Sequence, residues 1–449
     1  MLRMFFRRIR PGQLIVLVFL GIILLGAGLL CLPAAARSGR PTPFLTSLFT
    51  ATSATCVTGL IRVDTGTHWT MFGQVVILLL IQIGGLGFMT IACLFFFALR
   101  RRIGLRQRMV IAQALGSDTY SGIVSLVRNI LRGTAAVEGV GALILFFRFL
   151  PEFGFGRALW YGVFHSVSAF CNAGFDVLAD VDAGGSLCRY ATDPVVNFTI
   201  MALIVIGGLG FAVWGDIRHH RRFSRLSVYS RLVVIITTVL IFGGAGVFAA
   251  LEWNNPNTIG ELTAPQKLMA ALFQSVTLRT AGFATFDQNA LSDVSKAASD
   301  LLMLVGGSSG STAGGVKTAT VGVILLSAWS TARGRTSVHV MKRQIPRQAV
   351  ENASALFILV LLLSGLGAAF LSIADHVSLE NALYETISAL CTVGLTTGIT
   401  SSLGTASQII LIVLMFFGRL GIMTISVGFM AANRAEERVS YAETKIMIG

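Results

Sequence analysis

The run Thr55-Cys56-Val57-Thr58-Gly59-Leu60 is short and polar and ends in one glycine and one large apolar residue. Three weaker copies follow along the chain: Cys171-Asn172-Ala173-Gly174-Phe175, Arg279-Thr280-Ala281-Gly282-Phe283 and Cys391-Thr392-Val393-Gly394-Leu395. Their glycines, at positions 59, 174, 282 and 394, are 115, 108 and 112 residues apart in a chain of 449. Because each spacing is close to a quarter of the chain, the pattern predicts four copies of one structural unit.

The composition excludes a soluble globular domain. Hydrophobic residues make up 54% of the chain and charged residues only 12%, which is far from the usual balance of soluble proteins. A helix needs about 20 apolar residues to cross a membrane. Long apolar runs lie at about 13–33, 71–99, 125–150, 194–215, 229–251, 299–330, 353–374 and 406–430. They predict an all-α membrane protein with eight transmembrane helices, the first of which is too long for a secretory signal core.

The net charge of +14 would suit a nucleic-acid-binding protein, but the basic residues are concentrated in a few places. Arginine and lysine cluster at 3–10, 100–108, 218–231 and 333–347, whereas the intervening loops carry most of the acidic residues. Basic loops mark the cytoplasmic side of a membrane protein. We therefore expect a lipid bilayer rather than nucleic acid as the partner, and both termini in the cytoplasm.

Shorter apolar segments lie inside each pair of long runs, at 43–54, 157–170, 266–278 and 379–390. At about 1.5 Å per residue, such segments reach only halfway through a membrane. A second glycine motif follows each polar run: Ile83-Gly84-Gly85-Leu86-Gly87-Phe88, Ile206-Gly207-Gly208-Leu209-Gly210-Phe211, Val305-Gly306-Gly307-Ser308-Ser309-Gly310 and Phe417-Gly418-Arg419-Leu420-Gly421-Ile422. Its first glycine comes 25, 33, 24 and 24 residues after the glycine of the polar run, and the extra length in the second unit is the polar loop from Ala179 to Asp193.

The two motifs together predict four helix–pore-loop–helix repeats, with eight transmembrane helices and four re-entrant half-helices around a pseudo-fourfold axis. The predicted parts are a cytoplasmic amino-terminal segment at 1–12, repeat 1 at 13–100, repeat 2 at 123–218, repeat 3 at 228–334 with a broken second helix, repeat 4 at 352–431 and a cytoplasmic carboxyl tail at 432–449.

The four polar runs are candidate segments of a cation filter. Non-helical backbone at membrane depth is tolerated where it lines water or is buried in protein, and four such segments can replace the hydration shell of a potassium ion with carbonyl oxygens. The alternative is that the glycines only allow helices to pack closely. The candidate ion-binding residues are Cys56, Val57, Thr58, Gly59, Cys171, Asn172, Ala173, Gly174, Arg279, Thr280, Ala281, Gly282, Cys391, Thr392, Val393 and Gly394.

Three acidic residues follow the polar runs, and we expect them in an outer vestibule: Asp64, Asp176 and Asp287. Carboxylates at a narrow mouth raise the local cation concentration. Ordinary solvated loop carboxylates are the alternative.

The third unit carries a candidate gate. Glycine in a helix interior costs about 1 kcal/mol relative to alanine, so we expect the glycines here to unwind the helix and leave a movable loop; a simple kink is the alternative. A phosphate loop needs lysine directly after its second glycine, but Val316 separates Gly315 from Lys317, so we expect no nucleotide on this chain. The candidate gate residues are Gly306, Gly307, Ser308, Ser309, Gly310, Ser311, Thr312, Ala313, Gly314, Gly315, Val316 and Lys317.

Arg419 completes the candidate gate, because it stands in the fourth glycine motif where the first three have Gly85, Gly208 and Gly307. A charge at this depth is costly and usually faces a cavity or a partner. Two roles remain open, a positive barrier in the conduction path and a pairing with the carbonyl groups of the broken third helix.

Nearly the whole chain resembles the Trk/Ktr/HKT superfamily of potassium transporters, and it is most similar to the B-type membrane subunit of bacterial Ktr systems. The start at Met1, without an additional helix pair, favours Ktr over Trk. The residues that carry the resemblance are Ser53-Ala54-Thr55-Cys56-Val57-Thr58-Gly59-Leu60, Ile81-Gln82-Ile83-Gly84-Gly85-Leu86-Gly87-Phe88-Met89-Thr90, Phe164-His165-Ser166-Val167-Ser168-Ala169-Phe170, Arg279-Thr280-Ala281-Gly282-Phe283 and Phe417-Gly418-Arg419-Leu420-Gly421.

The resemblance implies potassium uptake that is often sodium-dependent, a homodimer in the bacterial inner membrane, and a cytoplasmic ring of nucleotide-binding (RCK) regulatory subunits that bind ATP, ADP or a related nucleotide. By position it implies filter glycines at 59, 174, 282 and 394, a gating loop at 306–317 with Arg419 beside it, and a tail at 441–449 near the dimer and regulator interface. Cys56, Cys171 and Cys391 depart from the family pattern, which affects the side chains of the filter more than its backbone.

Two other classes of transport protein remain as alternatives. A secondary transporter for a small organic solute would bind its substrate at broken helices near the midplane of the membrane, and such carriers usually show two broken helices rather than four re-entrant segments. An unassisted ion channel would need neither the loop nor Arg419. We do not expect an enzyme.

Overall fold

The computed structural model describes residues 11–87, 123–178, 185–335 and 337–421. Several expectations fall outside these ranges: residues 1–10 of the amino-terminal segment, the end of repeat 1 at 88–100 with the basic cluster at 100–108, the end of repeat 4 at 422–431 and the tail at 432–449. The described chain is mostly helical. Its strands form one short antiparallel hairpin, β1 (His339–Val340) and β2 (Arg343–Gln344).

Apolar helices long enough to cross a membrane are present in the described residues. They are Val127–Phe170 within α8 (Ile123–Phe170), α11 (Val228–Glu252) and α15 (Arg347–Asp375). The bent pair α9 (Pro194–Leu209) and α10 (Phe211–His220) adds a fourth candidate span. Shorter apolar helices lie in α2 (Pro11–Leu30), α5 (Met71–Leu86), α14 (Thr318–Ala332) and α17 (Thr405–Leu420). The chain is a helical membrane protein, and eight crossings remain a prediction.

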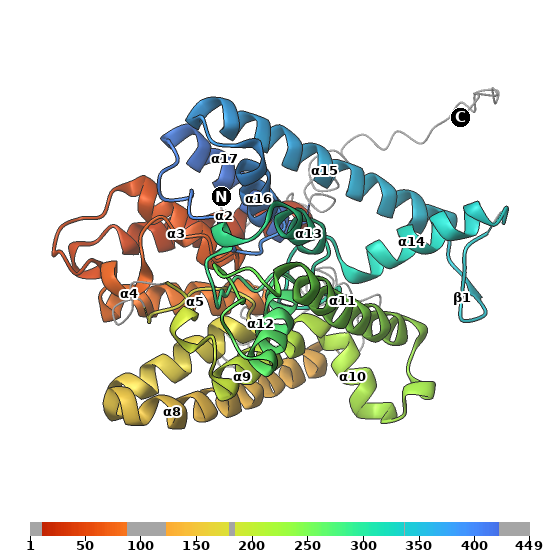
Figure 1. Ribbon diagram of the computed structural model, residues 1–449, viewed down its shortest axis with the longest axis horizontal. Helices are drawn as coiled ribbons and strands as arrows, with labels where there is room; N and C mark the ends of the chain where they lie inside the picture. The colour runs from red at the N-terminus through yellow and green to blue at the C-terminus, as the bar shows by residue number, and fades with distance from the viewer. Residues whose placement is uncertain (1–10, 88–122, 179–184, 336, 422–449) are drawn as a thin grey trace, which may run out of the picture.

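Three short helices and the end of α8 occupy the predicted half-length segments. They are α3 (Phe44–Cys56), α12 (Ala264–Thr277) and α16 (Leu379–Leu390). Within α8, Gly154 has non-helical angles (φ 71°, ψ 172°) and Pro151 precedes it, so the stretch that ends at Phe170 starts a new direction. α3, α12 and α16 pack against α2, α11 and α15 respectively. Figure 1 shows α12 near the middle of the helical body, with α8 and α15 along opposite edges.

The remaining elements connect or extend these helices. They are η1 (Pro33–Ala35), α4 (Thr65–His68), η2 (Cys188–Tyr190), η3 (Phe223–Arg225), η4 (Gln288–Ala290) and α13 (Asp293–Met303). Side-chain caps fix several helix starts: Thr70 accepts from the Gly73 N–H, Asp193 accepts from the Val195 N–H, and Ser378 accepts from the Asn381 N–H. Two apolar cores result, one mainly among α2, α3, α5, α8 and α9 and one mainly among α11 to α17.

The third unit has no helix between Met303 at the end of α13 and Thr318 at the start of α14. This interruption contains the glycine-rich segment, and Gly310 and Gly315 in it have φ of 71° and 64°. Glycine adopts positive φ without a Cβ clash. The unwound stretch therefore lies where the glycines predict it.

The second unit departs from expectation. The apolar run at 194–215 predicts one continuous helix, but the chain bends by 93° between α9 and α10. Gly210 at the bend has φ 89° and ψ 145°. Gly87 and Gly421, at the same place in the second glycine motif, have φ of 77° and 80° and end α5 and α17. The fifth residue of the motif therefore ends a helix in three units, and the expectation of a straight second helix is wrong.

We expect the substitution Gly210→Ala to lower stability. An added Cβ would lie 2.5 Å from Ser308 Oγ and 2.9 Å from the Ser309 carbonyl oxygen, and the positive φ adds backbone strain of roughly 1–3 kcal/mol. The midpoint of thermal unfolding in detergent should fall. Gly215→Ala is the matched control, because a Cβ there meets nothing within 4 Å and Gly215 lies inside α10. Equal midpoints for the two variants would contradict the account of the bend.

Candidate functional site

The four polar runs adopt one conformation. In each run the residue two positions before the glycine is left-handed, and the glycine itself also has positive φ. The left-handed residues are Val57 (φ 57°), Asn172 (59°), Thr280 (67°) and Thr392 (52°), and the glycines are Gly59 (97°), Gly174 (67°), Gly282 (79°) and Gly394 (93°). Each run is therefore the same turn, with glycine where other residues would be strained.

The four turns meet in a closed ring. A Cβ added to Gly59 would lie 2.6 Å from the Ala173 carbonyl oxygen, and one added to Gly174 would lie 2.8 Å from the Ala281 carbonyl oxygen. A Cβ on Gly282 would lie 2.6 Å from the Val393 carbonyl oxygen, and one on Gly394 would collide with the Thr58 carbonyl oxygen. Each turn thus touches the next in the order first, second, third, fourth, first. The structure brings together all four predicted glycines.

Hydroxyl groups of the short helices hold the turns in place. The Gly59 N–H donates to Ser53 Oγ at 3.1 Å, and the Gly394 N–H donates to Ser388 Oγ at 3.0 Å. In the second turn Ser168 Oγ donates to the Phe175 carbonyl at 2.7 Å. In the third turn Thr277 Oγ donates to the Phe283 carbonyl at 2.6 Å. These hydrogen bonds satisfy backbone N–H and carbonyl groups of the turns and make the turns more rigid.

Side chains of the turns are buried around the ring. Cys56, Cys171 and Cys391 are 0–1% exposed, and the cysteines of the described residues are free thiols. The buried hydroxyl oxygens of Thr58, Thr280 and Thr392 have no hydrogen-bond partner among the described residues. A buried hydroxyl without a partner is costly. Oxygen atoms of this kind suit a desolvated cation, which accepts oxygen ligands.

Arg279 belongs to the third turn, but its side chain contacts the broken helix of the third unit. Its Nη2 donates to the Gly306 carbonyl at 3.2 Å and to Thr318 Oγ at 3.1 Å. These two residues lie at the start and just beyond the end of the unwound stretch. The sequence suggested Arg279 as a filter residue, and the structure shows that its guanidinium ties the third turn to the broken helix.

The unwound stretch 304–317 packs against the second and fourth units. Its ends close on each other, because the Gly306 N–H donates to the Val316 carbonyl at 2.9 Å. Thr312 Oγ donates to the Phe170 carbonyl at 2.9 Å, at the end of the second short helix. A Cβ on Gly314 would collide with Thr392 Oγ of the fourth turn. The loop therefore lies directly against the ring, as a gate requires.

The unwound stretch also contacts the bend between α9 and α10. The Ser308 N–H donates to the Gly208 carbonyl at 3.0 Å, and the Phe211 N–H donates to the Gly310 carbonyl at 2.9 Å. Sequence reasoning missed this contact, because hydropathy does not distinguish a straight apolar helix from a bent one. The signal available was Gly210, which repeats the position of Gly87.

Arg419 lies near the end of α17 and donates only to backbone carbonyls. Its Nη1 bonds the Thr312 carbonyl in the unwound stretch, and its Nη2 bonds the carbonyls of Gly84 and, at 3.1 Å, Gly85. Among the described residues no carboxylate pairs with it. Of the two roles left open by the sequence, the structure supplies the carbonyl pairing and places the charge between the first unit and the loop.

The three acidic residues of the predicted vestibule do not form a cluster of equivalent groups. Asp64 accepts from the Thr67 N–H at 2.7 Å and caps α4. Asp287 is exposed and accepts from the Asn289 N–H at 2.9 Å. Asp176 is 7% exposed and directly follows the second turn. Asp64 and Asp287 therefore act as local caps, whereas Asp176 is the buried member of the three.

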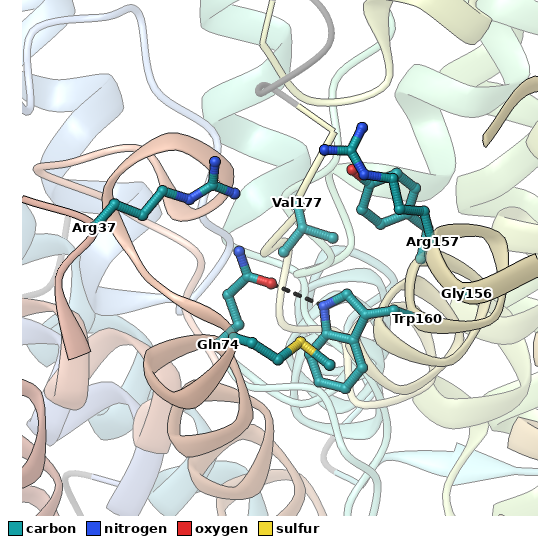
Figure 2. Close-up of a pocket in the computed structure, with 8 residues that line it drawn as sticks. Arg37, Gln74, Gly156, Arg157, Trp160 and Val177 are labelled. Atoms are coloured by element: carbon teal, nitrogen blue, oxygen red, sulfur yellow. Dashed lines mark hydrogen bonds between the residues drawn. The ribbon is translucent and has the colours of Figure 1, made fainter. Parts of the chain in front are cut away.

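A pocket of about 220 Å³ lies between the first and second units (Figure 2). Gln74 and Trp160 line it and share a hydrogen bond of 2.8 Å, and Arg37 and Arg157 stand at its sides.

Comparison with known proteins shows the family of this chain. A family model described as "TrkH: Cation transport protein" matches residues 25–438. The potassium/sodium uptake protein NtpJ of Enterococcus hirae is 40% identical over 99% of this chain and 98% of its own length. The Ktr system potassium uptake protein B of Bacillus subtilis is 39% identical over 98% of this chain and 97% of its own length. These relatives are ion transporters and not enzymes.

A solved structure shares the fold. The crystal structure of the potassium transporter TrkH from Vibrio parahaemolyticus matches with a TM-score of 0.74 over 93% of this chain and 84% of that chain, at 18% sequence identity. At this identity the match supports the fold of the chain and not its substrate.

Proposed function

We propose, from the premise that this chain belongs to the TrkH family of cation transport proteins, that it is the ion-translocating membrane subunit of a bacterial potassium uptake system. The membership confirms the resemblance to the Trk/Ktr/HKT superfamily. The observation that carries the proposal is the closed ring of four glycine turns, in which each glycine faces a carbonyl oxygen of the next turn. Rings of backbone carbonyls replace the hydration shell of potassium.

In this proposal the four helix–turn–helix units are pore-loop repeats, and the filter consists of the sixteen residues at 56–59, 171–174, 279–282 and 391–394. The carbonyl oxygens coordinate potassium, and the buried threonine hydroxyls offer further oxygen ligands. Sodium is a candidate second ion, because the Enterococcus hirae relative is described as a potassium/sodium uptake protein.

The loop at 306–317 and Arg419 form the gate of the proposed transporter. Two guanidinium groups hold the loop against the ring: Arg279 bonds its first carbonyl, at Gly306, and Arg419 bonds its middle, at Thr312. Opening requires that these bonds break or move. The positive charge of Arg419 beside the path also raises the energy of a passing cation while the loop is closed.

The proposed assembly is a homodimer in the bacterial inner membrane, with both termini in the cytoplasm and a cytoplasmic ring of nucleotide-binding RCK subunits that controls the gate. The description of a relative as a protein of the Ktr system supports a system of several components. The nucleotide belongs to the ring in this proposal, and this chain binds none.

The variant Gly59→Ser tests the filter. The added Cβ would lie 2.6 Å from the Ala173 carbonyl oxygen, so the second turn must shift and the ring must change shape. We expect the preference for potassium over sodium uptake in proteoliposomes to fall about fivefold or more. This factor corresponds to a loss of about 1–2 kcal/mol in the free-energy difference between the two bound ions. Gly39→Ser is the matched control, because Gly39 also has positive φ but a Cβ there meets nothing within 4 Å. An unchanged preference in Gly59→Ser would reject the filter assignment.

The variant Arg419→Gln tests the gate. It removes the charge and weakens the hydrogen bond to the Thr312 carbonyl. Basal potassium uptake, measured without a regulatory ring, should therefore rise about twofold to tenfold, which corresponds to the free energy of one hydrogen bond. Arg347→Gln is the control, since its pair with Glu351 is exposed and lies at the start of α15. Uptake that falls or stays level, in protein that still elutes as one species, would show that Arg419 does not hold the gate closed.

A further inference from the structure

The loop that makes the second unit longer than the others reaches across to the third turn. Its described part, residues 185–193, starts at Gly185 and ends at the cap of α9. The Leu187 N–H donates to the Ala284 carbonyl at 2.9 Å. Ser186 Oγ accepts from the Ala284 N–H at 2.9 Å. Ala284 is the second residue after Gly282, so both of its backbone groups are held by a different unit.

The third turn differs from the first and fourth in its internal support. Six residues before the glycine, those turns have Ser53 and Ser388, and both serines accept the glycine N–H. The third unit has Val276 at that position, and valine offers no hydroxyl. In the second turn the equivalent serine, Ser168, donates to the Phe175 carbonyl instead. The third turn has no serine at this position and is held from outside by the loop of the second unit.

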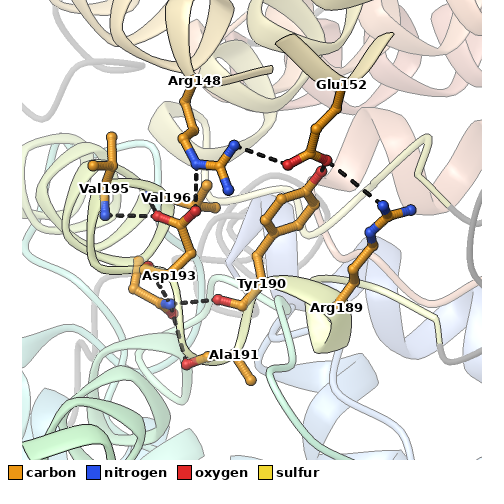
Figure 3. Close-up of polar contacts among 9 residues, drawn as sticks. Arg148, Glu152, Arg189, Tyr190, Ala191, Asp193, Val195 and Val196 are labelled. Carbon is orange, nitrogen blue, oxygen red and sulfur yellow. Dashed lines mark hydrogen bonds and ion pairs between the residues drawn. The ribbon is translucent and has the colours of Figure 1, made fainter. Parts of the chain in front are cut away.

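The far end of the loop is fixed by a polar network on α8 and α9 (Figure 3). Arg148 bonds Asp193 through Nε and Glu152 through Nη1, the latter at 2.8 Å. The Tyr190 hydroxyl donates to Glu152 Oε2 at 2.6 Å. Asp193 Oδ1 also caps α9 by accepting from the Val195 N–H at 2.9 Å.

Backbone contacts strengthen the network. Asn197 Nδ2 donates to the carbonyl groups of Tyr190 and Asp193, both at 2.7 Å, and Leu187 is 1% exposed in the core. An exposed ion pair alone contributes little. Here the ion pairs share their carboxylates with a helix cap and a tyrosine hydroxyl, so the loop has one defined position.

We propose that residues 185–193 are a positioning element for the filter: the Arg148–Glu152–Asp193–Tyr190 network fixes the loop, and the loop fixes the outer end of the third turn through Ala284. This inference rests on the proposed function of the four turns. A ring of carbonyls prefers one ion when the number and positions of its oxygens are maintained. Without the loop, the third turn keeps its Thr277 and Arg279 contacts but loses both contacts at Ala284, so the ring adapts more easily to the smaller sodium ion.

The test combines two measurements on the full chain. Hydrogen exchange followed by mass spectrometry reports protection of the peptide that contains Ala284, and uptake of potassium and sodium into proteoliposomes reports the preference. Ser186→Ala removes the acceptor for the Ala284 N–H, and Arg148→Gln breaks the network. Ser186→Asn is the rescue variant, because Ser186 has φ 47°, and asparagine tolerates that angle and keeps an acceptor oxygen. Arg189→Gln is the control, since its contact with Glu152 is longer, at 3.7 Å, and more exposed.

We expect Ser186→Ala and Arg148→Gln to speed exchange at Ala284 and to lower the potassium preference about twofold to tenfold, the range for one hydrogen bond. Ser186→Asn and Arg189→Gln should stay near wild type in both measurements. Unchanged exchange would overturn the hold on Ala284, and faster exchange with unchanged preference would overturn the role in selectivity. Wild-type protein without any cation uptake would instead reject the proposed function, which distinguishes the two failures.

Discussion

The absence of side chains at four glycines is the constraint on which the rest of the structure depends. Each glycine lies against a carbonyl oxygen of the neighbouring turn at a separation that no Cβ tolerates. The second glycine motif extends the same constraint outward. A Cβ on Gly84, Gly207 or Gly418 would collide with the last carbonyl groups of the short helix in its own unit, at Thr55, Phe170 and Leu390. Glycine thus sets both the closure of the ring and the distance of the helices that surround it.

The four turns share one conformation, but the hydrogen bonds that hold them differ between the units. The first and fourth turns hold their glycines through serine hydroxyls, whereas the third turn has Val276 in that place and receives support from the loop of the second unit. The third unit also supplies the unwound stretch that lies against the ring, where Arg279 and Arg419 donate to its carbonyl groups. The specialised features therefore gather at the third unit, which departs most from the shared pattern.

Much of this arrangement follows from the sequence. The periodic glycines and the half-length apolar segments locate the turns, and the glycine-rich run at 306–315 locates the unwound stretch. The bend at Gly210 does not follow, because hydropathy is the same for a straight and a bent apolar helix. The side chain of Arg279 and the contact of Leu187 with Ala284 also escape prediction, because they join residues far apart in the chain. The sequence predicts the four turns and the unwound stretch, and only the fold shows the bend at Gly210 and the side chains that lie against these segments.

The most direct test of the central claim is the position of a heavy potassium analogue in crystals of the protein. Thallium replaces potassium at oxygen sites, and its anomalous scattering locates it without reference to the protein density. The account predicts a thallium peak inside the ring, surrounded by the carbonyl oxygens of Thr58, Ala173, Ala281 and Val393. A ring without a peak, with thallium bound elsewhere in the membrane region, would contradict it.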